Sequence, residues 1–583
     1  MATGLTSLVA AGVYYSVVES HAVSAPLVLR RRGGQPGARD DDELFLPTAR
    51  RGASRTPSRW ALSPVLDVVR DYRWGRVEET MGEDPYLVSM IGAAYVRGLE
   101  GAGIIATLKH FAGYSASRAA RNHGPVPMGR RELMDMILPP FETAIALGGA
   151  RSVMNSYSDV DGVPAGADPW LLTEVLREEW GFTGTVVSDY WAVSFLATMH
   201  RIAADTDEAG VRALAAGIDV ELPDTLGFGR QLVERVRRGE IPGALIDRAA
   251  RRLLTQKVQL GLLDPDWTPE KSVSGASSVD LDSPDNRALA RELAERSIVL
   301  LDAGTALPLL GEGRTAPRRI AVAGPCADDP RTFMGCYAFP THVLPRHPGL
   351  GLGVEAPSLL DALRAELPDA EIVHERGCDV QGDDRSGFAA AATAAREADL
   401  CVVAVGDHAG LFGHGTSGEG CDADDLRLPG VQEKLLAELA ATGTPVVVVV
   451  VSGRPYALGA AHAVAAGLVQ AFFPGEEGGH DVVAQVTRPV RQLTGFARIP
   501  LESGAEADVT FHVHADRTAF TGRDLRRIVE PGDIEVFAGT SAAEPPCQGR
   551  VRLTGPTRVV GHDRRLVTPV SVEKHEGSDA DQF

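Results

Sequence analysis

The stretch 181-GFTGTVVSDYWAV-193 contains the features that decide the fold. A short apolar run at 185–187 stops at Ser188 and Asp189, and two large aromatic residues, Tyr190 and Trp191, follow directly. Short continuous apolar runs are typical of strands that are buried on both faces of a parallel sheet. In parallel α/β folds the strand ends carry the functional side chains, so a carboxylate at this point is a candidate for chemistry.

Similar apolar runs alternate with helical patterns between residues 61 and 262. The runs lie at 104–111, 150–158, 184–190 and 216–223. Helical segments such as RELMDMILPPFETAIALG and DPWLLTEVLREEWG separate them. Strands separated by helices imply a parallel sheet, and a (β/α) barrel is its natural closed form. We therefore expect an α/β fold in which residues 61–262 form a (β/α) barrel with its polar strand ends on one rim.

The rest of the chain divides into further segments. A linker rich in Pro, Ser and Asp covers 263–283, and a second α/β unit, an α/β sandwich domain, is predicted for 284–480. Its VVVVVV run indicates a buried parallel strand. Residues 481–583 show short β patterns between turn residues and predict a small β domain. Residues 1–60 are expected to be irregular, because 29–60 is rich in Arg, Gly, Pro and Asp and has no hydrophobic period.

The overall composition narrows the range of partners. The 583 residues carry a formal net charge of −20, which repels phosphate backbones and anionic lipids, so we expect no nucleic-acid or membrane partner. The six cysteines form no CxxC pair, which predicts neither a disulfide framework nor a zinc site. No run reaches the roughly 20 apolar residues of a membrane helix, and the first residues lack a basic region and a clean cleavage site. A cytoplasmic location is the expectation.

Four strand-end segments carry polar and aromatic side chains that could form a site. They are RDYRWGRVEETMGEDP at 70–85, LKHFAGY with Lys109 and His110, MNSYSDVDG with Asn155, Tyr157 and Asp161, and VVSDYW with Asp189. Taken alone, a polar residue in any of these segments is more often a hydrogen-bonded loop residue without a functional role. A barrel would place all four on one rim, where polar groups, aromatic faces and a carboxylate are the chemistry of a sugar site.

Glycoside hydrolysis normally requires a second carboxyl group. The second unit offers Glu419, within the glycine-rich segment LFGHGTSGEGCDADDLRLPG at 411–430. Taken alone, this segment is more often an ordinary surface loop with an exposed glutamate.

Together these segments resemble glycoside hydrolase family 3, the β-glucosidases and β-xylosidases. The matching motifs run in the family's order over about 61–479: RDYRWGRVEETMGEDPYL, TLKHFAGY, MNSYSDVDGVPA, GFTGTVVSDYWAV, AGIDVELP, SGEGCDADDLRLPG and QAFFPGEEGG. VTRPVRQLTGFARIPL at 486–501 resembles the family's fibronectin type III-like module. The resemblance implies a β-glycoside or small oligosaccharide substrate, and neither a metal nor a cofactor.

The resemblance also implies roles for individual residues. Asp189 takes the position of the catalytic nucleophile, and Glu419 that of the general acid/base. Arg76, Lys109 and His110 match residues that hydrogen-bond the sugar in the −1 subsite, and Met154 and Tyr157 match residues that line it. A retaining double displacement needs the two carboxyls about 5–5.5 Å apart. It also needs Glu419 protonated at first, so a raised pKa is expected there, while Asp189 stays ionised.

The chain departs from the family pattern in two places. No motif in 29–60 matches the strands that precede ALSPVLDV in the family, and the segments expected between Gly479 and HDVVAQ are missing. We therefore expect an incomplete barrel and a partial fibronectin type III-like β-sandwich. A weakly active or inactive sugar-binding relative is the alternative function.

Two further questions stay open in the sequence. His123 could serve as the acid/base, as in the family's N-acetylglucosaminidase branch, although Arg121 stands where an orienting aspartate would be expected. Tyr190 stands where many β-glucosidases carry Trp, which tilts the expectation slightly toward xylosidase-like specificity. Glucose, xylose and arabinose are not separable as the −1 sugar.

Overall fold

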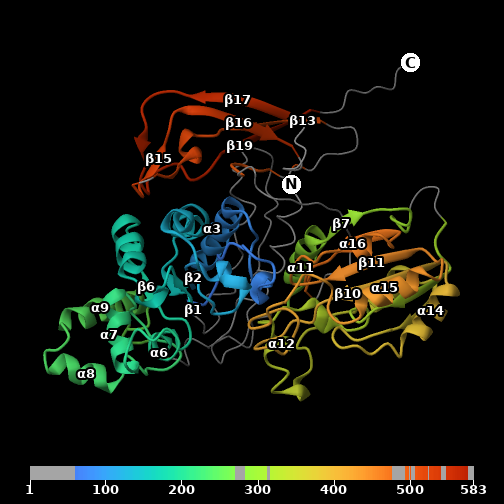
Figure 1. Cartoon of the computed structure of the whole chain (residues 1–583), viewed down its shortest axis with the longest axis horizontal. Coiled ribbons are helices and arrows are strands. Elements are labelled where there is room, and N and C mark those ends of the chain that lie inside the picture. Colours follow the sequence, from blue (N-terminus) through green and yellow to red (C-terminus); the bar gives the residue numbers. More distant parts are fainter. Residues whose placement is uncertain are drawn as a thin grey trace.

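The structure is a computed structural model. It describes residues 60–268, 282–310, 315–475, 493–497, 499, 506–522, 524–539 and 547–575. The expected irregular segment before residue 60, the centre of the 263–283 linker and most of the 486–501 match lie outside the described residues. Figure 1 shows two α/β bodies side by side, with a red β domain over the helices of the first.

The first body contains a parallel sheet in the strand order β1-β2-β3-β6. Its strands are β1 Trp60–Ala61, β2 Ile105–Phe111, β3 Ser152–Asn155 and β6 Thr185–Val187. In register, Thr107 of β2 pairs with Ser152 of β3, which pairs with Thr185 of β6. The expected strand at 216–223 contributes only an isolated parallel bridge between Val187 and Val220. Within residues 60–268 the sheet stays open, as expected for an incomplete barrel.

Helices cover this sheet between its strands (Figure 1). They are α3 Pro85–Gly101, α4 Arg130–Glu132, α5 Pro139–Thr143, α6 Ala192–Thr198, α7 Thr206–Ala216, α8 Arg230–Arg237 and α9 Gly243–Gln259, with a π-helix at Trp170–Glu179. Helix α3 begins at Pro85, and the Asp84 carboxylate caps it by accepting the N–H groups of Tyr86 and Leu87. All seven residues of β2 are buried, so this strand forms the centre of the core that supports the site.

The second body is a six-stranded sheet in the order β7-β12-β11-β10-β8-β9. Its strands are β7 Val299–Asp302, β8 Arg319–Ala323, β9 Glu371–Glu375, β10 Leu400–Gly406, β11 Val446–Val451 and β12 Gly467–Gln470. All neighbouring pairs are parallel except β7 with β12. Its helices are α11 Pro284–Ser297, α12 Phe339–His342, α13 Leu359–Glu366, α14 Phe388–Arg396, α15 Gln432–Ala440 and α16 Gly459–His462. A separate apolar core fills each face of the sheet, which gives the expected α/β sandwich.

The third body consists of antiparallel strand pairs. Its strands are β13 Glu506–Phe511, β14 Phe520–Thr521, β15 Arg527–Val529, β16 Gly532–Ala538, β17 Cys547–Leu553, β18 Arg558–Val559 and β19 Val570–His575. It docks on the first body through ion pairs of Glu142 with Arg564, at 2.5 Å, and with His562, at 3.0 Å. Burial raises the pKa of Glu142, but hydrogen bonds from these two partners outweigh it and lower the pKa to about 2. Across the described residues, no helix is both long and apolar enough to cross a bilayer.

Candidate active site

The structure brings the candidate residues to one end of the first sheet. Lys109 and His110 lie near the end of β2, Met154 lies in β3, and Asp189 follows β6 by two residues. All seven candidates are buried, each with 8% or less of its surface exposed: Arg76, Lys109, His110, Met154, Tyr157, Asp189 and Glu419. Buried charges are rare unless they are paired or functional, so this cluster is the outstanding candidate site.

The Asp189 carboxylate is held by its neighbours. Its Oδ1 accepts the N–H of Tyr190 at 2.8 Å, and its Oδ2 lies 3.6 Å from Nε2 of His110. Its own N–H donates to Oδ1 of Asn155 at 3.3 Å, which ties the end of β6 to the end of β3. The position of Asp189 is therefore determined by backbone and side-chain contacts from three strands.

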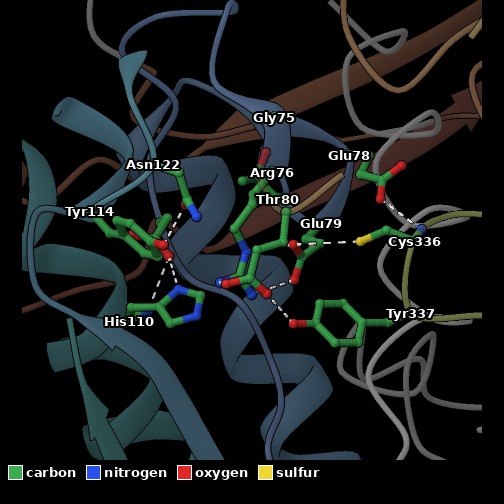
Figure 2. A network of polar contacts seen from close by, with 12 residues as sticks. Gly75, Arg76, Glu78, Glu79, Thr80, His110, Tyr114, Asn122, Cys336 and Tyr337 are labelled. Atoms are coloured by element: carbon green, nitrogen blue, oxygen red, sulfur yellow. Dashed lines mark hydrogen bonds and ion pairs between the residues drawn. The ribbon is translucent and has the colours of Figure 1, made fainter. Parts of the chain in front are cut away.

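Glu419 enters this cluster from the second body. Its Oε1 lies 3.3 Å from Nη1 of Arg76, and the Tyr337 hydroxyl donates to its Oε2. The Tyr337 ring also lies 5.7 Å from the Arg76 guanidinium and 5.4 Å from Nζ of Lys109, within cation–π range. Figure 2 shows Tyr337 reaching across to the cluster around Arg76 and Glu79. Glu419 is thus not the exposed glutamate that its loop alone would suggest.

The expectation of a raised pKa at Glu419 is wrong for this arrangement. Burial does raise the pKa of Glu419, but the positive charge of Arg76 and the hydrogen bond from Tyr337 outweigh it. The positive charge of Lys109 acts in the same direction, and the pKa lies below its usual value. Glu419 is therefore ionised in this arrangement at neutral pH.

Two tyrosines lie within electrostatic reach of both carboxylates. Burial raises the pKa of Tyr157, and the charges of Asp189 and Glu419 raise it further. The pKa of Tyr114 is raised by burial as well, with contributions from the same two carboxylates. Both phenols are therefore protonated donors, and their common neighbours indicate that Asp189 and Glu419 face one space.

Contacts to backbone groups dock the Glu419 loop on the first body. The Gly418 N–H donates to the Gly75 carbonyl at 2.8 Å. Asp422 accepts the N–H groups of Gly75, at 2.9 Å, and of Asn122, at 2.6 Å. A Cβ on Gly75 would lie 2.1 Å from the Gly418 carbonyl oxygen, so the close approach requires glycine here.

Arg454 also holds the Glu419 loop against the first body. This arginine is fully buried, and its guanidinium donates to four carbonyls: those of Tyr72 and Arg73 in the first body, at 3.2 and 2.7 Å, and those of Thr416 and Cys421 in the loop, both at 2.8 Å. The four bonds span both bodies, so Arg454 determines how the Glu419 loop sits on the sheet end.

His123 borders the same cluster. Its ring lies 4.3 Å from that of Tyr157 and 5.7 Å from that of Phe195. Burial lowers the pKa of His123, and Glu419 acts in the opposite direction. Among the described residues, no group of three or more His, Cys, Asp or Glu side chains is arranged to hold a metal ion.

Sequence reasoning missed three residues of the site. Asp67 is fully buried behind His110, and its only signal is the apolar run PVL before it, the pattern that pointed to Asp189. Arg454 follows the VVVVVV strand and could have been found in the same way. Tyr337 carries no signal, because it lies in an irregular segment of the second body.

Comparison with known proteins matches most of the chain to one family. The model described as "Glycosyl hydrolase family 3 N terminal domain" matches residues 49–256, and that of the family's C-terminal domain matches 298–490. A "Fibronectin type III-like domain" matches 479–542.

Individual relatives and solved structures agree with these matches. A beta-xylosidase of Formosa agariphila is 37% identical over 442 residues, covering 73% of this chain and 58% of its own. A periplasmic beta-glucosidase of Salmonella typhimurium is 32% identical, covering 73% and 56%. The chain thus spans less than two thirds of these relatives. A solved beta-glucosidase of Erythrobacter marinus is 27% identical with a TM-score of 0.68, covering 92% and 78%. A mutant Listeria innocua beta-glucosidase in complex with laminaribiose has a TM-score of 0.73 at 23% identity, covering 87% and 83%, which supports the fold alone.

Proposed function

Since the chain belongs to glycoside hydrolase family 3, we propose that it is a retaining, exo-acting β-glycosidase. Its substrates are oligosaccharides with terminal non-reducing β-D-glucosyl or β-D-xylosyl residues. Residues 61–262 supply the nucleophile Asp189, and residues 284–480 supply the general acid/base Glu419. The cytoplasmic location and the lack of a cofactor stay predictions from the sequence.

In this proposal the reaction proceeds by two displacements. A carboxylate oxygen of Asp189 attacks the anomeric carbon, the bond to the leaving oxygen breaks, and Glu419 gives its proton to that oxygen. Glu419 then takes a proton from water, the water oxygen bonds to the anomeric carbon, and the bond to Asp189 breaks. Arg76, Lys109 and His110 hold sugar hydroxyls, while Met154 and Tyr157 line the −1 subsite.

One observation carries the proposal: Glu419, from a separate body, is buried in ion-pair contact with Arg76 inside the cluster that contains Asp189. Asp189 and Glu419 are two buried carboxylates within electrostatic reach of the same tyrosines, Tyr114 and Tyr157, and glycoside hydrolysis uses such a pair of carboxyl groups. Glu419 must take up a proton before it acts as an acid. A sugar that engages Arg76 would weaken one of the contacts that keep it ionised, and so favour that uptake.

The second candidate is a sugar-binding relative with weak or no turnover. The open sheet in the described residues 60–268 favours it, because the rim on the β1 side has no further strand there to complete a −1 subsite. Binding through Arg76, Lys109 and His110 would survive in such a protein.

Purified protein tested on 4-nitrophenyl β-glucoside and β-xyloside separates the two candidates. We expect wild-type turnover with the β-anomer formed first, as followed by proton NMR. D189A should lose about 10⁴-fold or more, and E419A should be rescued by azide, which needs no general base to attack. The control is D425N, which changes an exposed carboxylate six residues after Glu419. Equal rates for wild type and D189A would exclude Asp189 as the nucleophile, and sugar binding without turnover would favour the second candidate.

A further inference from the structure

Asp67, His110 and Asp189 form a buried chain at the sheet end. Oδ2 of Asp67 lies 2.8 Å from Nδ1 of His110 and also accepts the His110 backbone N–H at 3.0 Å. On the other side of the ring, Nε2 lies 3.6 Å from Oδ2 of Asp189. Asp67 and His110 are 0% and 1% exposed, so water does not compete for the Asp67–His110 contact.

We propose that Asp67 is a positioning residue that decides whether Nε2 of His110 presents a hydrogen or a lone pair to Asp189 and the sugar. The inference rests on the proposed function only for the part that His110 plays toward a substrate. The ring orientation and the proton position are properties of this chain by itself.

The chemistry of the pair follows from its geometry. When the pair holds its shared proton, Nε2 carries a hydrogen, whichever of Asp67 and His110 is assigned that proton. When the shared proton leaves, the Asp67 carboxylate 2.8 Å away demands a hydrogen on Nδ1, and Nε2 is left as an acceptor. An acceptor that faces a carboxylate repels it, so only the protonated pair supports an ionised Asp189 and donates to a sugar oxygen.

Burial of the pair, modified by the surrounding charges, brings this exchange close to neutral pH. Burial raises the pKa of Asp67 to about 7, although the His110 N–H, Arg76 and the Ser115 N–H lower it and Glu79 raises it. Burial lowers the pKa of His110, and the positive charges of Arg76 and Lys109 add to that effect, as does His123. Tyr114, whose ring lies 4.9 Å from that of His110, stays protonated and adds no charge.

The test is nitrogen NMR of the protein labelled with ¹⁵N in its histidine rings, without substrate, between pH 5.5 and 8.5. H110Q identifies the His110 signals. We expect wild-type Nε2 to be protonated at low pH and to lose its hydrogen around pH 7. In D67N the amide oxygen must take over the backbone N–H, so the ring should donate from Nδ1 and Nε2 should be unprotonated throughout.

Matched measurements make the result decisive. D71N changes a nearby aspartate that pairs with Arg73, and it should leave the His110 signals as in wild type. D67N should lower kcat/KM at pH 6 by about 10- to 100-fold, the scale on which groups that orient a histidine act. An unchanged Nε2 state in wild type across this pH range, or identical D67N and wild-type signals, would overturn the proposal. The wild-type titration decides alone if D67N does not fold, and it does so whether or not the protein hydrolyses glycosides.

Discussion

Replacing Arg454 with methionine should separate the docking of the Glu419 loop from the rest of the fold. The wild-type guanidinium donates to four buried carbonyls, two in each body. Methionine keeps much of the apolar stem but leaves these carbonyls without their donor. A hydrogen bond to a charged group contributes about 1.5–3 kcal/mol, but the losses do not add because neighbouring groups relax and water enters. We expect a loss of about 3–5 kcal/mol, the usual result of breaking a buried charged network.

The kinetic consequence depends on the leaving group. R454M should let the Glu419 loop shift, and a displacement of about 1 Å can cost about 100-fold in rate. A β-glycoside of 2,4-dinitrophenol needs little help from an acid because its leaving group is already a stable anion. We therefore expect kcat/KM to fall about 100-fold for a phenyl β-glycoside and less than about tenfold for the dinitrophenyl one.

The control is R427M, which changes an exposed arginine on the same segment whose guanidinium pairs with Asp425. Its unfolding free energy should stay within about 0.5 kcal/mol of wild type in urea titrations. Equal losses for R454M on both glycosides would mean that Arg454 acts on the fold as a whole. If R454M leaves both the urea midpoint and the rates unchanged, Arg454 does not hold the Glu419 loop in place.

Three further changes test separate contacts. Y337F removes a hydrogen bond that lowers the pKa of Glu419, so the pKa should rise and the alkaline limb of kcat/KM should move to higher pH; an unmoved limb would contradict this contact. G75A should displace the Glu419 loop, since its Cβ would lie 2.1 Å from the Gly418 carbonyl oxygen, and it should slow phenyl glycosides more than dinitrophenyl ones. Rates equal to wild type would mean that the loop can shift without affecting the reaction. E142Q should destabilise the protein by about 3 kcal/mol at pH 7, from a pKa lowered from 4.5 to about 2. A carboxyl whose pKa is lowered by folding stabilises the folded state at pH values above the pKa that it has in the unfolded chain. The difference in unfolding free energy between wild type and E142Q should therefore shrink as pH falls from about 5 toward 2. A difference in urea midpoints that stays constant over this range would exclude the pairing with Arg564 as its cause.

The parts of the fold that could be predicted are those determined by local patterns. The VVVVVV run forms β11, because six consecutive β-branched apolar residues favour a strand that is buried on both faces. Asp189 could be placed at a sheet end because an apolar run stops there. The run at 216–223 failed as a strand because only Val220 finds a bridging partner, and strand pairing is decided by neighbours rather than by the run itself.

The parts of the site that could not be predicted depend on contacts between bodies. A motif identified Glu419, but not its contact with Tyr337, 82 residues away, nor its contact with Arg76 of the other α/β body. The pKa of Glu419 could not be predicted from its motif for the same reason. The proposed role suggested a raised pKa, but Arg76, Tyr337 and Lys109, which the fold brings to Glu419, lower it. The pKa of a buried group depends on all the charged and hydrogen-bonding groups around it, so a single motif does not determine it.

Many of the docking contacts of the second body involve backbone groups. Arg454 donates to carbonyls, Asp422 accepts backbone N–H groups, and Gly418 donates to the carbonyl of Gly75. Backbone groups are present whatever the side chains are, so these bonds constrain the path of the loop and not the identity of its residues. Only the donors and acceptors themselves, and the glycine at the closest approach, are restricted. A loop held through backbone groups in this way brings the Glu419 carboxylate into the cluster of the first body without relying on most of its own side chains.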